Sequence, residues 1–208
     1  MNIIIHRGTH QIGGSAIEIS TKSTRIILDF GNELSLDEKY IPINLDIDGV
    51  TKGMLDCDGI VISHYHMDHL GQLTSALPEI PLYMGKLSKE VAMIATEHQD
   101  KDLYLCLLGA NTFRGGEAFT IGNINIRPLV IDHSAVDSYM FVIEAEGKRV
   151  LYTGDFRMHG LRSHIVEKLV KTYIGEVDVL ITEGTLVSRG VNDGISEAAV
   201  LELSLIHI

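Results

Sequence analysis

Three histidines and an aspartate occupy the six positions from His64 to His69. Before them, Gly59-Ile60-Val61-Ile62 is an apolar, β-branched run typical of a buried strand. After them, the segment 70–77 has helix-like apolar spacing and is followed by Pro78. The sequence therefore predicts a metal-binding loop at the point where a buried strand ends and a helix begins.

The spacing of the cluster predicts how its side chains are shared between ions. Alternate side chains of an extended backbone point the same way, so His64 and His66 can chelate one ion together. Asp68 is a favourable N-cap residue, and a chain that turns into the helix there directs Asp68 and His69 towards a second position. Two neighbouring metal ions are the expectation. The alternative is a polar turn that is rich in histidine by chance, since the chain has ten histidines in 208 residues.

The pattern His-x-His-x-Asp-His after a strand resembles the signature of metallo-β-lactamase-fold hydrolases. The resemblance implies an α/β (α+β) fold, namely the metallo-β-lactamase αββα sandwich, with one or two zinc ions. It also implies further ligands from later strand ends: a histidine, then an aspartate, then a final histidine.

Two later strand ends carry residues that match this expectation. His133 lies in Asp-His-Ser-Ala-Val-Asp-Ser, and the resemblance implies that it joins His64 and His66 as a third nitrogen ligand, leaving an open position for water. Asp155 lies in Tyr-Thr-Gly-Asp-Phe-Arg, and the resemblance implies that it bridges the two ions. Asp29 is expected to support the metal loop by hydrogen bonding. Zinc suits these ligands best and manganese is the alternative; ordinary turn roles are the structural alternative for each residue.

The flanking residues resemble one branch of the superfamily, the ribonuclease J and β-CASP enzymes. His-Ser-x-x-Asp at His133 and Gly-Asp-Phe-Arg at Asp155 match forms found there, and Thr-Glu-Gly-Thr around Glu183 resembles the acidic motif that opens the β-CASP region. Asp68 and Glu183 are the implied catalytic carboxylates, Glu183 acting near the leaving group. Arg157 is a candidate phosphate contact. The segment 158–164 does not match ribonuclease J.

These motifs predict a metal-dependent hydrolase that cleaves phosphodiester bonds in RNA through a metal-activated hydroxide. A net charge of −11 argues against broad attraction to nucleic acid, although bound cations offset negative charge locally. Two alternatives stay open: a hydrolase of small esters, lactones or thioesters on the same metal platform, and a non-catalytic RNA-binding scaffold. Oligomeric state and endonuclease or exonuclease mode are not predicted.

Composition bounds the hydrophobic core and the cellular compartment that we expect for this chain. The chain is 45% hydrophobic and can bury a substantial core. Cys57 and Cys106 form neither a zinc knuckle nor a disulfide framework, which predicts two buried thiols and a cytoplasmic location. The start of the chain lacks the features of a signal peptide, and no apolar run approaches the roughly 20 residues of a membrane span.

Periodicity predicts two sheets, the second beginning near Glu117. A long irregular excursion is expected over 32–51, and a helix over 86–108 that faces the sheet through Leu87, Val91, Ile94 and Ala95. His98 is expected on a solvated face. Further helices are expected over 161–173 and from Ser196. Strands are expected at 2–6, 15–20, 25–30, 59–62, 81–84, 118–121, 123–130, 139–145, 149–153 and 177–182.

The expected organisation is an N-terminal part of a metallo-β-lactamase domain over 1–189 and the start of a β-CASP region over 190–202. The last six residues, 203–208, equal a translation of CTGTCTCTTATACACATC, a transposon-adapter sequence, and are expected to be non-native. His207 then has no functional role, and the αββα sandwich is incomplete at the C-terminus without its final histidine ligand. We accordingly expect this chain to bind closer to one metal ion than two and to turn over slowly.

Overall fold

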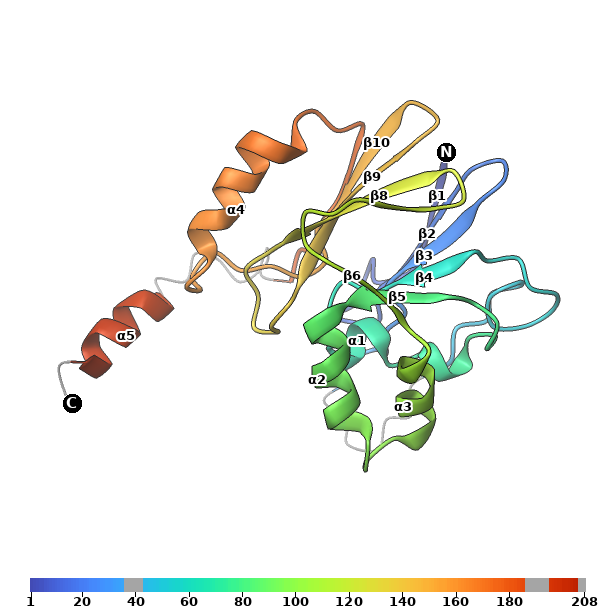
Figure 1. Ribbon diagram of the computed structural model, residues 1–208, viewed down its shortest axis with the longest axis horizontal. Helices are drawn as coiled ribbons and strands as arrows, with labels where there is room; N and C mark the ends of the chain where they lie inside the picture. The colour runs from blue at the N-terminus through green and yellow to red at the C-terminus, as the bar shows by residue number, and fades with distance from the viewer. Residues whose placement is uncertain (36–42, 186–194, 206–208) are drawn as a thin grey trace.

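The protein has four layers, in which two β-sheets pack face to face and helices cover their outer faces (Figure 1). The computed structural model describes residues 1–35, 43–185 and 195–205. This arrangement is the αββα sandwich predicted from the sequence.

The first sheet has the order β1-β2-β3-β4-β5-β6. Its first three strands are antiparallel, and the strands from β3 onwards are parallel. The six strands are β1 (Asn2–Arg7), β2 (Ala16–Ser20), β3 (Arg25–Leu28), β4 (Gly59–Val61), β5 (Leu82–Gly85) and β6 (Asn111–Phe113).

The second sheet has the order β11-β10-β9-β8-β7, and only the pair β10 and β11 is parallel. Its start confirms the prediction that a second sheet begins near Glu117. The strands are β7 (Phe119–Ile121), β8 (Ile124–Val130), β9 (Tyr139–Ala145), β10 (Lys148–Tyr152) and β11 (Val179–Ile181).

The helices divide between the two outer faces. On the first sheet lie α1 (Met67–Leu70), a 3-10 turn (Leu73–Ser75), α2 (Lys86–Thr96) and α3 (Lys101–Leu108), and on the second lies α4 (Ser163–Leu169), which continues into a π-turn (Val170–Ile174). Helix α5 (Glu197–Leu205) extends away from both sheets in Figure 1.

Three apolar clusters hold these layers together. The inter-sheet cluster includes Ile19, Ile26 and Phe141 from both sheets. A second cluster, with Ile27 and Leu107, lies under the helices of the first sheet, and a third, with Val142 and Val166, lies under α4. Alternation along β3 sends Ile26 into one cluster and Ile27 into the other, because successive side chains of a strand point to opposite faces.

The predicted helix over 86–108 is two helices, because Asp100 begins a new one. Its side chain accepts a hydrogen bond from the backbone N–H of Leu103 at 3.0 Å, which is an N-cap interaction. The predicted packing face of α2 is wrong: Ser88, Ala92 and Thr96 are buried, whereas Leu87 and Ile94 are 50% and 76% exposed. The buried face of α2 thus carries small side chains.

Several smaller predictions have clear outcomes. Helix α1 begins at Met67 with His66 as its N-cap, so the prediction of Asp68 as N-cap is wrong and Asp68 lies in the first turn. His98 is 90% exposed, as predicted. Cys57 is buried, but Cys106 is exposed, contrary to prediction. Strand β6 was not predicted.

The predicted boundary at residue 189 lies in 186–194, outside the described residues, as do positions 206–208. Within the described ranges, none of the helices has the length and apolar character needed to cross a membrane.

Candidate metal centre

Five strand ends meet at one edge of the sandwich and carry the predicted site residues. β3 and β4 are parallel neighbours in the first sheet, and β8, β10 and β11 run in one direction in the second. Their carboxyl ends lead into Asp29, into the loop from Ser63 to His69, and into His133, Asp155 and Glu183 respectively. Ligand sites of α/β sheets form at such edges because loops from several strands converge there.

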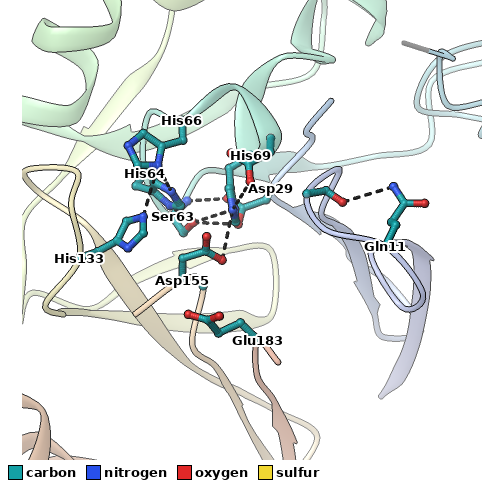
Figure 2. A network of polar contacts seen from close by, with 12 residues as sticks. Gln11, Asp29, Ser63, His64, His66, His69, His133, Asp155 and Glu183 are labelled. Atoms are coloured by element: carbon teal, nitrogen blue, oxygen red, sulfur yellow. Dashed lines mark hydrogen bonds and ion pairs between the residues drawn. The ribbon is translucent and has the colours of Figure 1, made fainter. Parts of the chain in front are cut away.

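His64, His66 and His133 form the first cluster, shown in Figure 2. Nδ1 of His66 lies 3.1 Å from Nε2 of His64 and 3.2 Å from Nε2 of His133. One ligand atom from each residue lies within 4.8 Å of the other two. These three nitrogens come from two different sheets, so the fold itself assembles the cluster.

The protonation states of these histidines favour a cation. Burial is the largest cause that lowers the pKa of His64, His66 and His133, and it lowers the pKa of His133 to about 4. All three imidazoles are therefore neutral at pH 7. A neutral imidazole has one donor and one acceptor nitrogen, so Nδ1 of His66 can pair with only one of its two neighbours through a proton. A divalent ion accepts all three lone pairs, so the donor set fits zinc.

His69 and Asp155 form a second cluster beside the first, with His64 shared between them. Nε2 of His69 lies 3.3 Å from Oδ1 of Asp155 and 3.7 Å from Oδ2 of Asp68. Burial opposes charge on His69, but the carboxylates of Asp29 and Asp155 raise its pKa to about 10. Burial also raises the pKa of Asp68. A cation here satisfies carboxylates that would otherwise repel one another.

Asp29 supports both clusters from beneath. Its Oδ1 accepts the backbone N–H of Ser63 at 2.7 Å, and its Oδ2 lies 2.7 Å from Nδ1 of His69. The hydroxyls of Ser63 and Tyr152 donate to the same Oδ2 at 2.8 and 2.5 Å. The carboxylate is fully buried. The supporting role of Asp29 stays a prediction, and these contacts are the ones that it requires.

Close backbone packing fixes the metal loop against the strand end at Asp29. The backbone N–H of Phe30 donates to the carbonyl of His69 at 2.7 Å, and that of Asn32 to the carbonyl of Met67 at 2.9 Å. A Cβ on Gly31 would lie 1.6 Å from the carbonyl oxygen of Asp68. Only glycine fits at this position, because any side chain would displace the loop.

Glu183 and Arg157 lie near the centre but are held by other groups. Oε1 of Glu183 accepts the backbone N–H of Phe156 at 2.9 Å. Nε of Arg157 lies 3.5 Å from Oδ1 of Asp132, and Nη1 lies 2.7 Å from Oε1 of Glu197. A phosphate contact by Arg157 stays a prediction, and it requires exchange of these ion pairs.

Two contributors to the site were not singled out from the sequence, Ser63 and Tyr152. Ser63 lies 3.0 Å from Nδ1 of His64 through its hydroxyl, and Tyr152 reaches Asp29 across the two sheets. The position of Ser63 directly before the motif was the available signal. Nothing in the sequence alone indicates that Tyr152 and Asp29, 123 residues apart, are in contact.

Comparison with known proteins identifies the family. A family model described as a β-lactamase superfamily domain matches residues 44–197. An RNase J-like protein of Methanocaldococcus jannaschii is 28% identical over 195 residues, which cover 86% of this chain and 41% of the relative. Endoribonuclease ysh-1 of Neurospora crassa is 28% identical over 200 residues, which cover 86% of this chain and 23% of the relative. This chain thus spans less than half the length of these relatives.

A solved structure with the same architecture is that of a protein of unknown function from Enterococcus faecalis. It superposes with a TM-score of 0.82 at 20% identity and covers 99% of this chain and 56% of the other. This likeness confirms the fold, and the curated relatives confirm the predicted resemblance to the ribonuclease branch. The chain belongs to the β-lactamase superfamily.

Proposed function

We propose that this protein hydrolyses phosphodiester bonds in RNA. The observation that carries the proposal is that two ligand clusters, joined at His64, lie at one strand-end edge of a chain whose relatives are named ribonucleases. The proposed metal is zinc, with one or two ions per chain. His64, His66 and His133 form the tighter site, since their nitrogens need no deprotonation at neutral pH.

The proposed roles of the residues follow from their contacts. Divalent ions, when bound, polarise a phosphoryl oxygen and lower the pKa of water towards neutrality. Asp29 orients His69 through Nδ1, which directs Nε2 towards Asp155. Asp68 lies beside the same nitrogen and is proposed to hold the attacking water and accept its proton.

Glu183 is the proposed carboxylate near the leaving group. It lines the same cavity as Asp68, His69 and Asp155, and its bond to the N–H of Phe156 ties it to the loop that carries Asp155. In its protonated form this carboxyl group can give the proton that the departing ribose oxygen needs, and it is left as the carboxylate.

The test compares substrate classes under identical conditions. The zinc-loaded and manganese-loaded chain is incubated with end-labelled single-stranded RNA, bis-p-nitrophenyl phosphate, a lactone and a thioester. The proposal predicts metal-dependent cleavage of both phosphodiesters, at a low rate, and loss of this cleavage in His66→Ala. Turnover of the lactone or thioester without either phosphodiester would assign a small-molecule hydrolase instead. No zinc or manganese in the purified protein would assign a scaffold.

A further inference from the structure

Arg7 belongs to the same cavity as the candidate metal centre. It ends strand β1 and lines a cavity of about 530 Å³ together with Asp68, His69, Asp155 and Glu183. Figure 2 shows the adjoining loop, which carries Gln11, on the side of His69 away from His133. The cavity therefore extends from the second ligand cluster to the loop after β1.

The guanidinium of Arg7 is buried and incompletely paired. Its side chain is only 9% exposed. Nε lies 3.5 Å from Oε1 of Glu33, and Nη2 donates to the carbonyl of Ile43 at 2.7 Å. Nη1 is also buried, yet within the described part of the chain it has no hydrogen-bond partner. A buried charged donor without an acceptor is costly, so its presence points to an anion that enters from outside the chain.

The loop after β1 is shaped around this side chain. Gly14 has a φ of +73°, and a Cβ there would lie 2.7 Å from Cδ of Arg7. Any other residue at position 14 would push the arginine from its place. The surrounding loop thus fixes the position of the guanidinium in the cavity wall, and Glu33 and the carbonyl of Ile43 contact it on one side.

Charge identifies the kind of anion. Among the described residues that line the cavity, Arg7 is the only arginine or lysine, facing a wall that includes three carboxylates. A guanidinium matches a phosphate group through paired N–H donors. Arg157, the cation suggested by the sequence, is already paired with Asp132 and Glu197. Of these two arginines, Arg7 is the one with a buried donor that has no partner among the described residues.

We propose that Arg7 binds a backbone phosphate of the RNA next to the phosphate that is hydrolysed. This inference rests on the proposed function and names a binding contact of the same site. Arg7 holds the flanking nucleotide, and the metal ligands hold the reacting one. A cation at this position offsets locally the repulsion that a net charge of −11 exerts on RNA.

The test measures RNA affinity rather than turnover. The zinc-loaded chain is titrated in the cold with a fluorescein-labelled decauridylate, a denaturing gel checks that the oligonucleotide is intact after each titration, and anisotropy is followed at several salt concentrations. Arg7→Gln should weaken binding about tenfold and reduce the slope of log K against log salt by about 0.7, the value for one phosphate contact on a single strand. Arg127→Gln, at an exposed arginine of β8 outside this cavity, should leave both unchanged.

Two further variants separate binding from a structural role. Glu33→Gln breaks the same ion pair but keeps the cation, so it should bind RNA as tightly as the wild type or more tightly. Arg7→Lys keeps the positive charge but loses the paired N–H donors of the guanidinium. It should therefore keep the slope of log K against log salt and bind RNA about threefold more weakly. If Arg7→Gln does not fold, Arg7→Lys alone decides the question.

Each contrary outcome has its own meaning. Unchanged RNA affinity in Arg7→Gln overturns the inference. If only Arg7→Lys folds, unchanged affinity in that variant overturns it. An equal loss of affinity in Arg7→Gln and Glu33→Gln also overturns it. If the wild type still hydrolyses bis-p-nitrophenyl phosphate and RNA in that case, the proposed function stands. A wild type that neither binds nor cleaves RNA overturns both.

Discussion

Oδ2 of Asp29 lies 2.7 Å from Nδ1 of His69, at the fully buried end of β3. This contact fixes which ring nitrogen of His69 faces the cavity, because the other nitrogen is committed to the carboxylate. Nε2 is thereby presented to Asp155 at 3.3 Å. The two residues are 40 positions apart in the sequence and meet only because β3 and β4 are parallel neighbours.

The variant Asp29→Asn should weaken the second cluster. A neutral amide accepts the N–H of Nδ1 more weakly and makes Nε2 of His69 a less basic ligand, and outer carboxylates of this kind typically change metal affinity by about 10- to 100-fold. Zinc affinity is measured by competition with a chelator of known affinity. Asp102→Asn, at an exposed aspartate of α3, is the matched control and should bind zinc like the wild type. Equal affinity in both variants would remove the supporting role of Asp29.

His66→Ala and Asp68→Ala should each lower turnover by at least about 100-fold while the fold is kept. Asp68 contributes to folding mainly through its backbone carbonyl, which accepts the N–H groups of Gly14 and Ser15 at 3.1 Å and remains in the alanine variant. Circular dichroism checks the fold, and rates on labelled RNA check function. His98→Ala, at a histidine that is 90% exposed, is the control. A wild-type rate in either site variant would exclude the metal mechanism.

Asp137 should stabilise the loop that carries His133, because its side chain caps helix α2 on the first sheet. Its Oδ2 accepts the backbone N–H of Ser88 in the first turn of α2 at 3.0 Å, and its Oδ1 accepts the hydroxyl of Tyr139. Asp137→Ala should lower the free energy of unfolding by about 1 kcal/mol. Its φ of 63° favours asparagine over alanine, so Asp137→Asn should lose less. Urea denaturation measures both, and equal losses would contradict the account.

Glu18 should make the fold sensitive to acid. Burial raises the pKa of Glu18, but hydrogen bonds from Arg25 and His6 outweigh this effect and lower it below 4.5. A lowered carboxyl pKa gives stability that is present above the unfolded pKa of 4.5 and is lost as pH falls through the folded pKa. Glu18→Gln should therefore cost about 1–3 kcal/mol of unfolding free energy at pH 7 and less near pH 4. A cost that grows in acid would refute this assignment.

The sequence alone predicted most of the strands and the αββα arrangement of this fold. Strands such as Tyr139–Ala145 alternate or run apolar over lengths that periodicity identifies. The predicted ligands His64, His66 and His133 do come together, since their motifs follow strands whose carboxyl ends share one edge. Whether they bind metal stays a prediction until it is measured.

Other features depend on contacts that the sequence does not encode locally. The packing face of α2 buries the small side chains of Ser88, Ala92 and Thr96, which a pattern of large apolar residues does not register. The contact from Tyr152 to Asp29 joins two sheets. The incomplete pairing of Arg7 appears only when the cavity around it is known.

Zinc content tests the central claim most directly. The wild type and a His64→Ala/His133→Ala double variant are equilibrated with zinc, dialysed against metal-free buffer and analysed by elemental mass spectrometry. We predict one tightly held ion per wild-type chain and close to none in the double variant, because the variant keeps only His66 of the first cluster. A wild type without zinc, or equal zinc in both proteins, would contradict the assignment of this edge as a metal centre.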